Sequence, residues 1–289
     1  MKSVASLRYG VVFKKAFSQP DIFQAFAEAI LGIKLHIEHV ETEKSFEQAI
    51  GNVDTTFDLF AEDKVNRLII DIQHQRYPDH YHRFLHYHCA ALLEQAVSAR
   101  DYRPALTVYT IVVLTSGDKH RRDMSLIDFD PKDRHGIPLG EIKHKVIYLC
   151  PKYHNEETPA AWREWLQAID DSLDEQVDES QYKNACIQKV IGLIEQDSLT
   201  PKERADMKEE YSKTLLLAEE REKFNQLQQQ LAQEQQLRVQ EQRYREQEQQ
   251  AHHQQLIEMA KVLLAQGIPI DKVVSMTQLP IHLIKQPAE

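Results

Sequence analysis

The stretch that most constrains the fold is residues 57–75, FDLFAEDKVNRLIIDIQHQ, in which two apolar segments flank a short polar one. Phe57 and Leu59 lie in the first segment, and residues 68–72 form the second, so strand-favouring side chains dominate both. The polar residues 62–66 between them are typical of a turn. The pattern predicts a β-hairpin.

Each predicted strand of this hairpin carries one acidic residue, Asp58 in the first and Asp71 in the second. A carboxylate inside an apolar strand costs on the order of several kcal/mol unless it is paired, hydrogen-bonded or bound to a metal. Two such residues on adjacent strands therefore indicate one site. Gln73 follows two residues after Asp71, and side chains two apart on a strand share a face, so we expect Asp71 and Gln73 to point the same way.

The hairpin resembles the core of the PD-(D/E)XK nuclease superfamily, in which an Asp on one strand is followed by a D/E-x-K/Q motif on the next. Residues 8–153 are further similar to the Rpn recombination-promoting nucleases, also called PD-(D/E)XK nuclease family transposases. The signatures that carry this resemblance are F-K-x-x-F at Phe13–Phe17, Asp58, Asp71-Ile72-Gln73, R-x-x-x-Y at Arg83 and Tyr87, and a closing strand at residues 146–149.

The resemblance implies a metal-dependent endonuclease that hydrolyses phosphodiester bonds of DNA, associated with recombination or transposition. The catalytic residues it implies are Asp58, Asp71 and Gln73. Two close carboxylates suit Mg²⁺ or Mn²⁺, with the backbone carbonyl of Ile72 as a third ligand. The candidate DNA contacts are Lys14, His74 and Arg83; for Lys14 and Arg83 the alternative of pairing with core acids stays open.

Two positions depart from the commonest family pattern. Asp71 stands where Glu is more usual, which shortens the ligand arm by one methylene, and Gln73 stands in place of the superfamily's Lys, which removes a cation. The opposing hypothesis is therefore a catalytically weak or inactive nuclease-fold protein that binds DNA or acts as a scaffold. The presence of both Asp58 and Asp71 favours the enzyme.

Histidines form a second candidate constellation after the hairpin, at His74, His80, His82, His86 and His88. The spacing of His82 and His86 can chelate zinc on a helix, but the Glu of an H-E-x-x-H motif is missing. Helix-surface and core histidines are the alternative. The cysteines, Cys89, Cys150 and Cys186, follow no metal-binding spacing and are expected to be reduced thiols.

The net charge of −10 argues against a basic coat for nucleic acid, but its distribution weakens that objection. Residues 1–150 carry 19 Lys and Arg against 20 Asp and Glu, which leaves 16 against 25 for residues 151–289. A nearly neutral first half can still present a basic face locally. The first ten residues have no apolar signal region and no long apolar run occurs, so we expect a cytoplasmic protein outside the membrane.

The expected fold is an α/β, restriction-endonuclease-like core with a mixed central sheet flanked by helices, followed by an all-α extension. Residues 106–114 read as a central strand, Leu35 to Val40 as another strand, and residues 41–52 as a loop. The domains we expect are a nuclease-like domain at 1–155, an acidic helical subdomain at 156–212, a Gln-rich long helix or coiled coil at 213–255, and a small helical domain at 256–289.

The Gln-rich segment contains 14 glutamines in residues 226–255. Leu217, Phe224 and Leu231 repeat at heptad spacing, but Arg238 and Arg245 occupy the next two positions. We expect a homodimer through this C-terminal helical region. The alternative is a solvated single helix or a disordered spacer.

Overall fold

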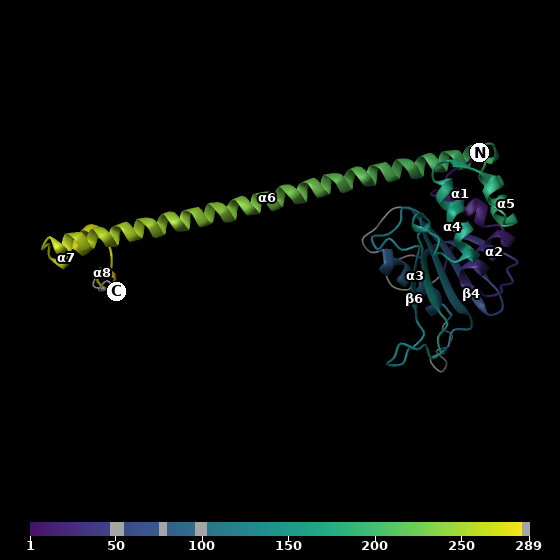
Figure 1. Cartoon of the computed structure of the whole chain (residues 1–289), viewed down its shortest axis with the longest axis horizontal. Coiled ribbons are helices and arrows are strands. Elements are labelled where there is room, and N and C mark those ends of the chain that lie inside the picture. Colours follow the sequence, from purple (N-terminus) through teal and green to yellow (C-terminus); the bar gives the residue numbers. More distant parts are fainter. Residues whose placement is uncertain (47–54, 75–79, 96–102, 285–289) are drawn as a thin grey trace. The chain divides into compact units, whose positions relative to one another are not determined.

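The computed structural model describes residues 1–46, 55–74, 80–95 and 103–284 (Figure 1). The chain divides into two compact units, Met1–Thr214 and Leu215–Glu289, and each is described by itself. Gln75, the last residue of the predicted hairpin, lies outside the described residues.

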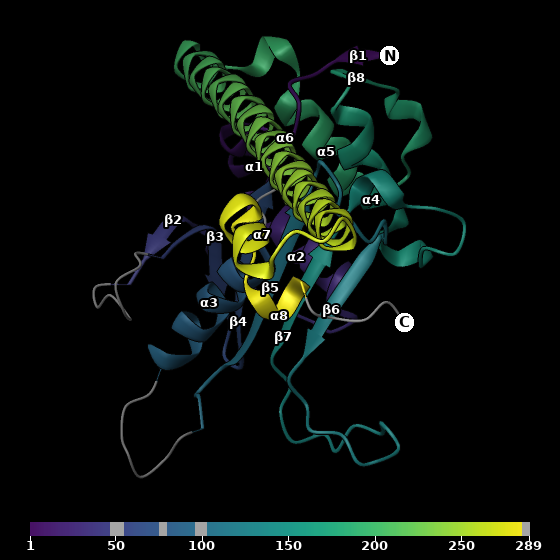
Figure 2. The same ribbon diagram turned by 90° about the vertical axis from the view of Figure 1, so that its left-hand side faces the viewer.

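A mixed six-stranded sheet forms the centre of the first unit, in the order β2-β3-β4-β5-β7-β6 (Figure 2). The β2-β3-β4 and β7-β6 neighbours are antiparallel, while β4-β5 and β5-β7 are parallel. The strands are β2 (Glu41–Ser45), β3 (Thr56–Glu62), β4 (Asn66–Gln73), β5 (Thr107–Leu114), β6 (Met124–Asp128) and β7 (Lys145–Leu149). This arrangement confirms the predicted α/β core with a mixed sheet.

The central strands are apolar because helices cover both faces of the sheet. In β5, Ile111 and Val113 are fully buried in one apolar cluster with Leu68 and Ile70 of β4, while Val108 is fully buried in the cluster on the other face. The predicted hairpin is β3 and β4, paired from Leu59↔Ile70 to Glu62↔Arg67. Asp63 stabilises its turn by accepting hydrogen bonds from the N–H groups of Val65 and Asn66 at 2.8 and 2.7 Å.

Helices of very different sequence position cover the first face of the sheet (Figure 1). They are α1 (Gly10–Phe17), α2 (Pro20–Leu31), α4 (Ala160–Ser172) and α5 (Ala185–Ile194), and their side chains form one apolar cluster with Leu59, Leu68, Ile70 and Ile111. The second face packs against α3 (His80–Leu93), whose Phe84 and Tyr87 join Ile69 and Val112.

The structure differs from the predicted domain boundary near residue 155. Phe17, Phe26 and Trp165 interlock, with ring centroids 5.2 Å apart for the phenylalanines and 5.3 Å apart for Phe26 and Trp165. A small sheet also pairs β1 (Lys2–Ser3) with β8 (Gln176–Val177). The helices after residue 155 therefore complete the core of the first unit, because their apolar stripe covers the helices at the start of the chain.

The strand expected at Leu35 to Val40 is not formed, and that part of the prediction was wrong. Helix α2 ends at Gly32, which adopts a left-handed conformation with φ of 66°, and the following segment buries Leu35 and Val40 without entering the sheet. The neighbouring strand is instead the polar β2, within the segment expected to be a loop. As the edge strand it is held by backbone pairing rather than by burial of side chains, so its sequence lacks an apolar signal. Residues 47–52 of that expected loop lie outside the described residues.

The second unit begins within α6 (Pro201–Ala265), whose side chains from residue 215 to residue 255 are all exposed. Ion pairs one turn apart support this helix, such as Arg238–Glu234 at 2.8 Å and Arg245–Glu241 at 2.7 Å. Its last turns pack against α7 (Ile270–Thr277) through Ala260, Val273 and Leu279, and α8 (Ile281–Ile284) follows. No helix in the described part of the chain combines the length and the apolar character that crossing a membrane requires.

Candidate metal centre

The backbone ladder of β3 is interrupted on both sides at Asp58. Pairing with β4 ends at Leu59↔Ile70, so the next step of the same register places Asp58 opposite Asp71. Pairing with β2 runs from Ser45↔Thr56 to Glu41↔Phe60 but omits the step at which Glu43 faces Asp58. The three acidic residues therefore share one row across three strands.

Side chains replace the missing backbone pairs between β3 and β4. The Asp58 N–H donates to Asp71 Oδ1 at 3.0 Å, and the Ile72 N–H donates to Asp58 Oδ2 at 3.0 Å. This reciprocal exchange leaves one carboxylate oxygen on each aspartate. Of these, Asp71 Oδ2 is buried and has no hydrogen-bond partner within the described residues.

Burial makes both carboxylates unfavourable in their charged form. Asp71 is 3% exposed, and its pKa is raised well above the ordinary value, first by burial and then by the charge of Asp58. Burial also raises the pKa of Asp58, although the Ile72 N–H and the nearby Lys14 lower it. Two neighbouring buried acids of this kind need either a shared proton or a bound cation.

The donor set fits a hard divalent cation. Carboxylate oxygens and a backbone carbonyl, here that of Ile72, are the ligands that Mg²⁺ and Mn²⁺ prefer. Within the described residues, no group of three or more His, Cys, Asp or Glu side chains is placed to hold a metal ion. Mg²⁺ commonly binds through one or two carboxylates and fills its shell with water and substrate phosphate, so two aspartates are sufficient.

A cavity of about 450 Å³ opens beside Asp58 and Ile72. Acidic side chains outnumber basic ones in its wall, which consists of Gly10, Val11, Lys14, Glu43, Asp58, Ile72, Asp206, Glu209, Glu210 and Lys213. A cavity with this charge repels a phosphate group unless a cation is present, because like charges in a partly desolvated site are poorly screened. The wall also combines residues from the beginning and the end of the first unit.

Lys14 lies inside this cavity and is paired with Glu43. Its Nζ is 2.6 Å from Glu43 Oε1, and its side chain is 21% exposed. Glu43 itself has a left-handed backbone with φ of 53°, which is unfavourable for a residue with a Cβ atom. Such strain persists where the surrounding structure enforces it, and it is frequent at functional sites. Lys14 thus pairs with an exposed acid of the cavity wall, and its role as a DNA contact stays a prediction.

Gln73 and His74 lie at the carboxyl end of β4, and neither is among the residues that line the cavity. The Gln73 carbonyl accepts the Thr115 N–H at 3.1 Å, and His74 Nδ1 is 2.9 Å from Thr115 Oγ1. Burial lowers the pKa of His74, and the charge of Arg8 lowers it further. His74 is therefore neutral near pH 7 and is held by the loop after β5.

Arg83 acts on the aspartates from the second face of the sheet. It is exposed on α3, where its Nη2 donates to the Tyr87 hydroxyl at 3.2 Å and its guanidinium lies 5.4 Å from the centre of the Tyr87 ring. Its positive charge lowers the pKa of both Asp58 and Asp71. The R-x-x-x-Y motif is thus a contact one helical turn apart.

The histidines after the hairpin have separate roles. His88 is buried, with Nδ1 2.9 Å from Thr110 Oγ1 and its ring stacked 5.0 Å from that of Phe129. Burial lowers its pKa to about 3, with a smaller contribution from His144. His80 Nε2 instead lies 3.2 Å from Asp118 Oδ2. Among the described residues these histidines do not form a zinc site, which favours the alternative of surface and core histidines.

Four acidic residues of the cavity wall, Glu43, Asp206, Glu209 and Glu210, were not predicted as site residues, and Glu43 and Glu210 make the clearest contacts. Both oxygens of the Glu210 carboxylate accept the Gly10 N–H, at 3.1 and 3.0 Å, across 200 residues of sequence. Glu43 lies in a polar edge strand that has no apolar alternation. A left-handed backbone at Glu43 and a contact of Glu210 with a residue 200 positions away leave no pattern in the neighbouring sequence. Neither residue could therefore be predicted from the sequence.

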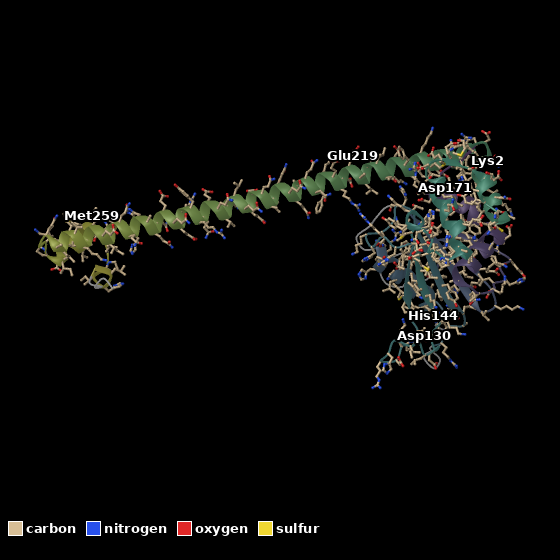
Figure 3. All side chains as sticks on the ribbon, in the orientation of Figure 1. Lys2, Asp130, His144, Asp171, Glu219 and Met259 are labelled. Atoms are coloured by element: carbon tan, nitrogen blue, oxygen red, sulfur yellow. The ribbon has the colours of Figure 1, made fainter. Side chains whose placement is uncertain are left out.

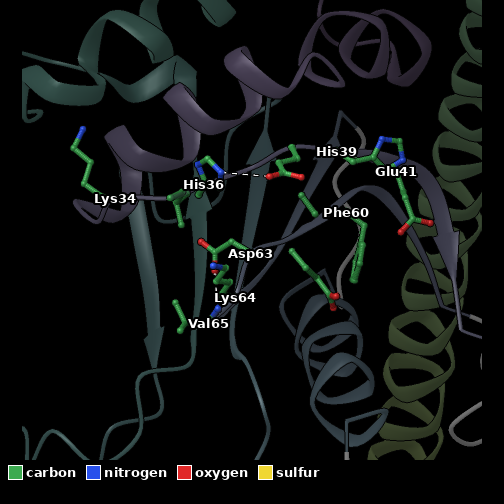
Figure 4. Close-up of a pocket in the computed structure, with 12 residues that line it drawn as sticks. Lys34, His36, His39, Glu41, Phe60, Asp63, Lys64 and Val65 are labelled. Carbon is green, nitrogen blue, oxygen red and sulfur yellow. Dashed lines mark hydrogen bonds and ion pairs between the residues drawn. The ribbon is translucent and has the colours of Figure 1, made fainter.

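A larger cavity of about 780 Å³ lies at the other end of β3 (Figure 4). Residues 34–41 and the β3–β4 turn line it, including His36, Phe60 and Lys64. Some of its polar groups already have partners: His36 pairs with Glu38 at 3.4 Å, and Asp63 caps the turn. It lacks buried acids without partners, so its size alone does not make it the reactive site.

One protein-family model matches most of the chain. The family is described as PD-(D/E)XK nuclease family transposase, and the match covers residues 8–217 of 289. A comparison with curated proteins found no match, and neither did a comparison with solved structures. The matched segment contains the six-stranded sheet, both aspartates and every residue that lines the smaller cavity. The chain therefore belongs to the PD-(D/E)XK nuclease family transposases.

Proposed function

We propose that the chain is a metal-dependent DNA endonuclease that hydrolyses phosphodiester bonds during recombination or transposition. The observation that carries this proposal is the pair of aspartates at the break in the β3–β4 ladder. Each accepts one backbone N–H from the opposite strand and retains one oxygen, and Asp71 Oδ2 is buried without a partner among the described residues. A purely structural role is a poor explanation, because two buried acids destabilise the metal-free fold.

Asp58, Asp71 and the carbonyl of Ile72 are the proposed ligands of Mg²⁺ or Mn²⁺. When bound, the ion supplies a Lewis acid for the phosphate and lowers the pKa of a coordinated water. The protein holds both carboxylates in place through backbone N–H groups of the central sheet, so their geometry depends on main-chain rather than side-chain order. That arrangement favours a preorganised site.

Gln73 is the proposed positioning group for the attacking water. It lies two residues after Asp71 on β4, so the two side chains share a face of the strand. An amide can orient water by hydrogen bonding but adds no positive charge to the transition state. Lys14 and Arg83 supply the positive charge near the aspartates, and with His74 they are the proposed DNA contacts.

Plasmid nicking in Mg²⁺, Mn²⁺ or EDTA tests the proposal. We expect wild-type protein to nick DNA with either metal and to be inactive in EDTA, while Asp58→Ala and Asp71→Ala are inactive under all conditions. The matched control is Glu219→Gln, which removes a negative charge from an exposed position of α6 and should nick at the wild-type rate (Figure 3). Nicking by either aspartate variant at the wild-type rate, with contaminating nuclease excluded, would overturn the proposed site.

The alternative function is a catalytically weak or inactive nuclease-fold protein that binds DNA or acts as a scaffold. One observation favours it: Gln73 replaces the cation of the D/E-x-K motif. A wild-type protein that binds Mn²⁺ and DNA but leaves plasmid intact would support this alternative.

We further propose that the C-terminal helical region makes the protein a homodimer. Leu217, Phe224 and Leu231 are 43%, 58% and 57% exposed at heptad spacing on α6. Their stripe is narrow and can be buried by a parallel helix of a second copy. Paired nuclease domains would allow both DNA strands to be cut, because one such site cuts one strand at a time.

A further inference from the structure

Glu210 lies in the wall of the candidate metal centre, although it comes from the first turns of α6. It lines the same cavity as Asp58 and Lys14 and is half-buried. Both of its carboxylate oxygens accept the N–H of Gly10, at 3.1 and 3.0 Å. The contact fixes α6 to α1 at the point where both helices border the site.

The Gly10 N–H needs a hydrogen-bond acceptor, and the Glu210 carboxylate provides one. Gly10 is the first residue of α1, and the N-cap residue Tyr9 provides no side-chain hydrogen bond. The first N–H groups of a helix have no intrahelical partner, and a negative charge is favoured beside them. Glu210 therefore caps the helix that carries Lys14 one turn further along.

The helix N-terminus favours an acidic cap but does not require one, and this cap lines the same cavity as Asp58. A neutral Gln, Asn or Ser would accept the same N–H without adding charge to a cavity that already holds Glu43 and Asp58. Burial is the main cause of the raised pKa of Glu210; the Gly10 N–H and the charge of Lys14 oppose it, and the charge of Asp58 adds to it. A bound divalent cation would offset the repulsion between the Glu210 and Asp58 carboxylates.

We infer that Glu210 is an outer carboxylate of the cation site, which strengthens divalent-cation binding at Asp58 without ligating the ion and positions the helix of Lys14. The inference rests on the proposed function. A direct ligand role does not fit, because the described residues contain no group of three acidic, His or Cys side chains placed around one ion. Glu210 acts instead through its charge, from a position in the cavity wall that does not contact the ion.

This inference makes the start of α6 part of the active site. All the candidate site residues predicted from the sequence lie between Lys14 and Arg83, whereas the cavity also includes Asp206, Glu209, Glu210 and Lys213. A change in α6 near residue 210 can therefore reach the metal through one side chain and the Lys14 helix through one hydrogen bond.

The test is Mn²⁺ titration of the full chain by calorimetry, with thermal unfolding measured in parallel. Glu210→Gln retains an oxygen that accepts the Gly10 N–H and removes only the charge. We expect its Mn²⁺ Kd to weaken about tenfold, the order of effect of one charge acting across a partly screened site, with little change in metal-free Tm. Glu210→Asp should recover part of the affinity, and Glu210→Ala should lose both affinity and Tm.

Glu219→Gln is the control, because it makes the same charge change at an exposed position of α6 that does not line the cavity. Its Mn²⁺ Kd should equal that of wild type. If Glu210→Gln binds Mn²⁺ as tightly as wild type, or more tightly, while wild type binds and nicks normally, this inference alone fails. If Glu210→Gln does not fold, the comparison of Glu210→Asp with Glu219→Gln decides, and equal affinities would overturn the inference. A wild-type protein that binds no divalent cation overturns both this inference and the proposed function.

Discussion

Replacing Asp71 by Asn should stabilise the metal-free protein. The amide oxygen can still accept the Asp58 N–H that Asp71 Oδ1 now accepts at 3.0 Å, so the strand gap keeps its hydrogen bond. The substitution removes a buried charge, the repulsion from Asp58, and an oxygen that has no hydrogen-bond partner within the described residues. The amide N–H group that replaces this oxygen is also buried, so the gain comes from the removed charge and its repulsion from Asp58, and we expect about 2 kcal/mol.

The expected gain depends on pH in a direction that follows from the raised pKa of Asp71. The folded protein holds the Asp71 proton to higher pH than the unfolded chain, whose pKa is near the ordinary value of 3.8. The contribution of Asp71 to the free energy of unfolding is therefore fully present below this value and is lost as the pH rises through the pKa of the folded state. Asparagine does not titrate, so the advantage of Asp71→Asn should be small near pH 4 and should grow as the pH rises.

Thermal unfolding in EDTA and in excess Mn²⁺ measures this effect. For a unit of this size about 2 kcal/mol corresponds to a Tm higher by about 4–8 °C in EDTA at pH 7.5. In Mn²⁺ at about a hundred times its Kd, wild type should gain about 2.7 kcal/mol, while Asp71→Asn should gain little. A variant that is less stable than wild type in EDTA at neutral pH would refute the reasoning, because Asp71 would then have a stabilising partner.

Three further predictions concern the cavity and the assembly. Gln73→Ala should slow nicking and Gln73→Lys should match or exceed wild type, since Lys adds the missing cation; a Gln73→Lys protein that binds Mn²⁺ but is inactive in the plasmid assay would contradict this role. Glu43→Gly should raise the metal-free free energy of unfolding by up to about 1 kcal/mol in denaturant titration, because glycine adopts the left-handed backbone freely. The same variant should slow nicking, because it releases Lys14 from its ion pair. Slower nicking together with lower stability would contradict the idea that Glu43 is strained. In light scattering at tens of micromolar, the full chain should be a dimer and a chain ending at Thr214 a monomer; a monomeric full chain would show that the Gln-rich segment is a spacer.

The central part of the fold could be predicted because its signal is local. Residues 57–75 contain nearly all of the two hairpin strands and both acids, and the apolar residues on either side of a polar turn indicate two buried strands. Residues 106–114 were equally readable, since a strand buried on two faces must be apolar throughout. The relation of Asp58 to Asp71 followed from the hairpin alone.

The polar edge strand β2, and contacts between residues far apart in the sequence, could not be predicted in the same way. The apolar Leu35 and Val40 are buried without forming a strand, while the polar β2 forms one through backbone pairing to β3. No composition rule separates these outcomes, because an edge strand needs no apolar face. Because β2 was not predicted to be a strand, its residue Glu43 was not predicted to lie near Asp58.

Contacts between residues that are far apart in the sequence determine the shape of the proposed site. Trp165 and Ile191 bury the apolar faces of α1 and α2, so the helices after residue 155 are required to hold α1 against β3. Glu210 then caps α1, and the last residue that lines the cavity is Lys213. The compact unit ends at Thr214, and the family match ends at residue 217. These boundaries rest on packing, on the cavity and on sequence similarity, and they agree within a few residues. The smallest chain that can hold the complete proposed cation site therefore extends to the start of α6, since a chain ending near residue 155 would lack both the cover of α1 and the carboxylate that caps it.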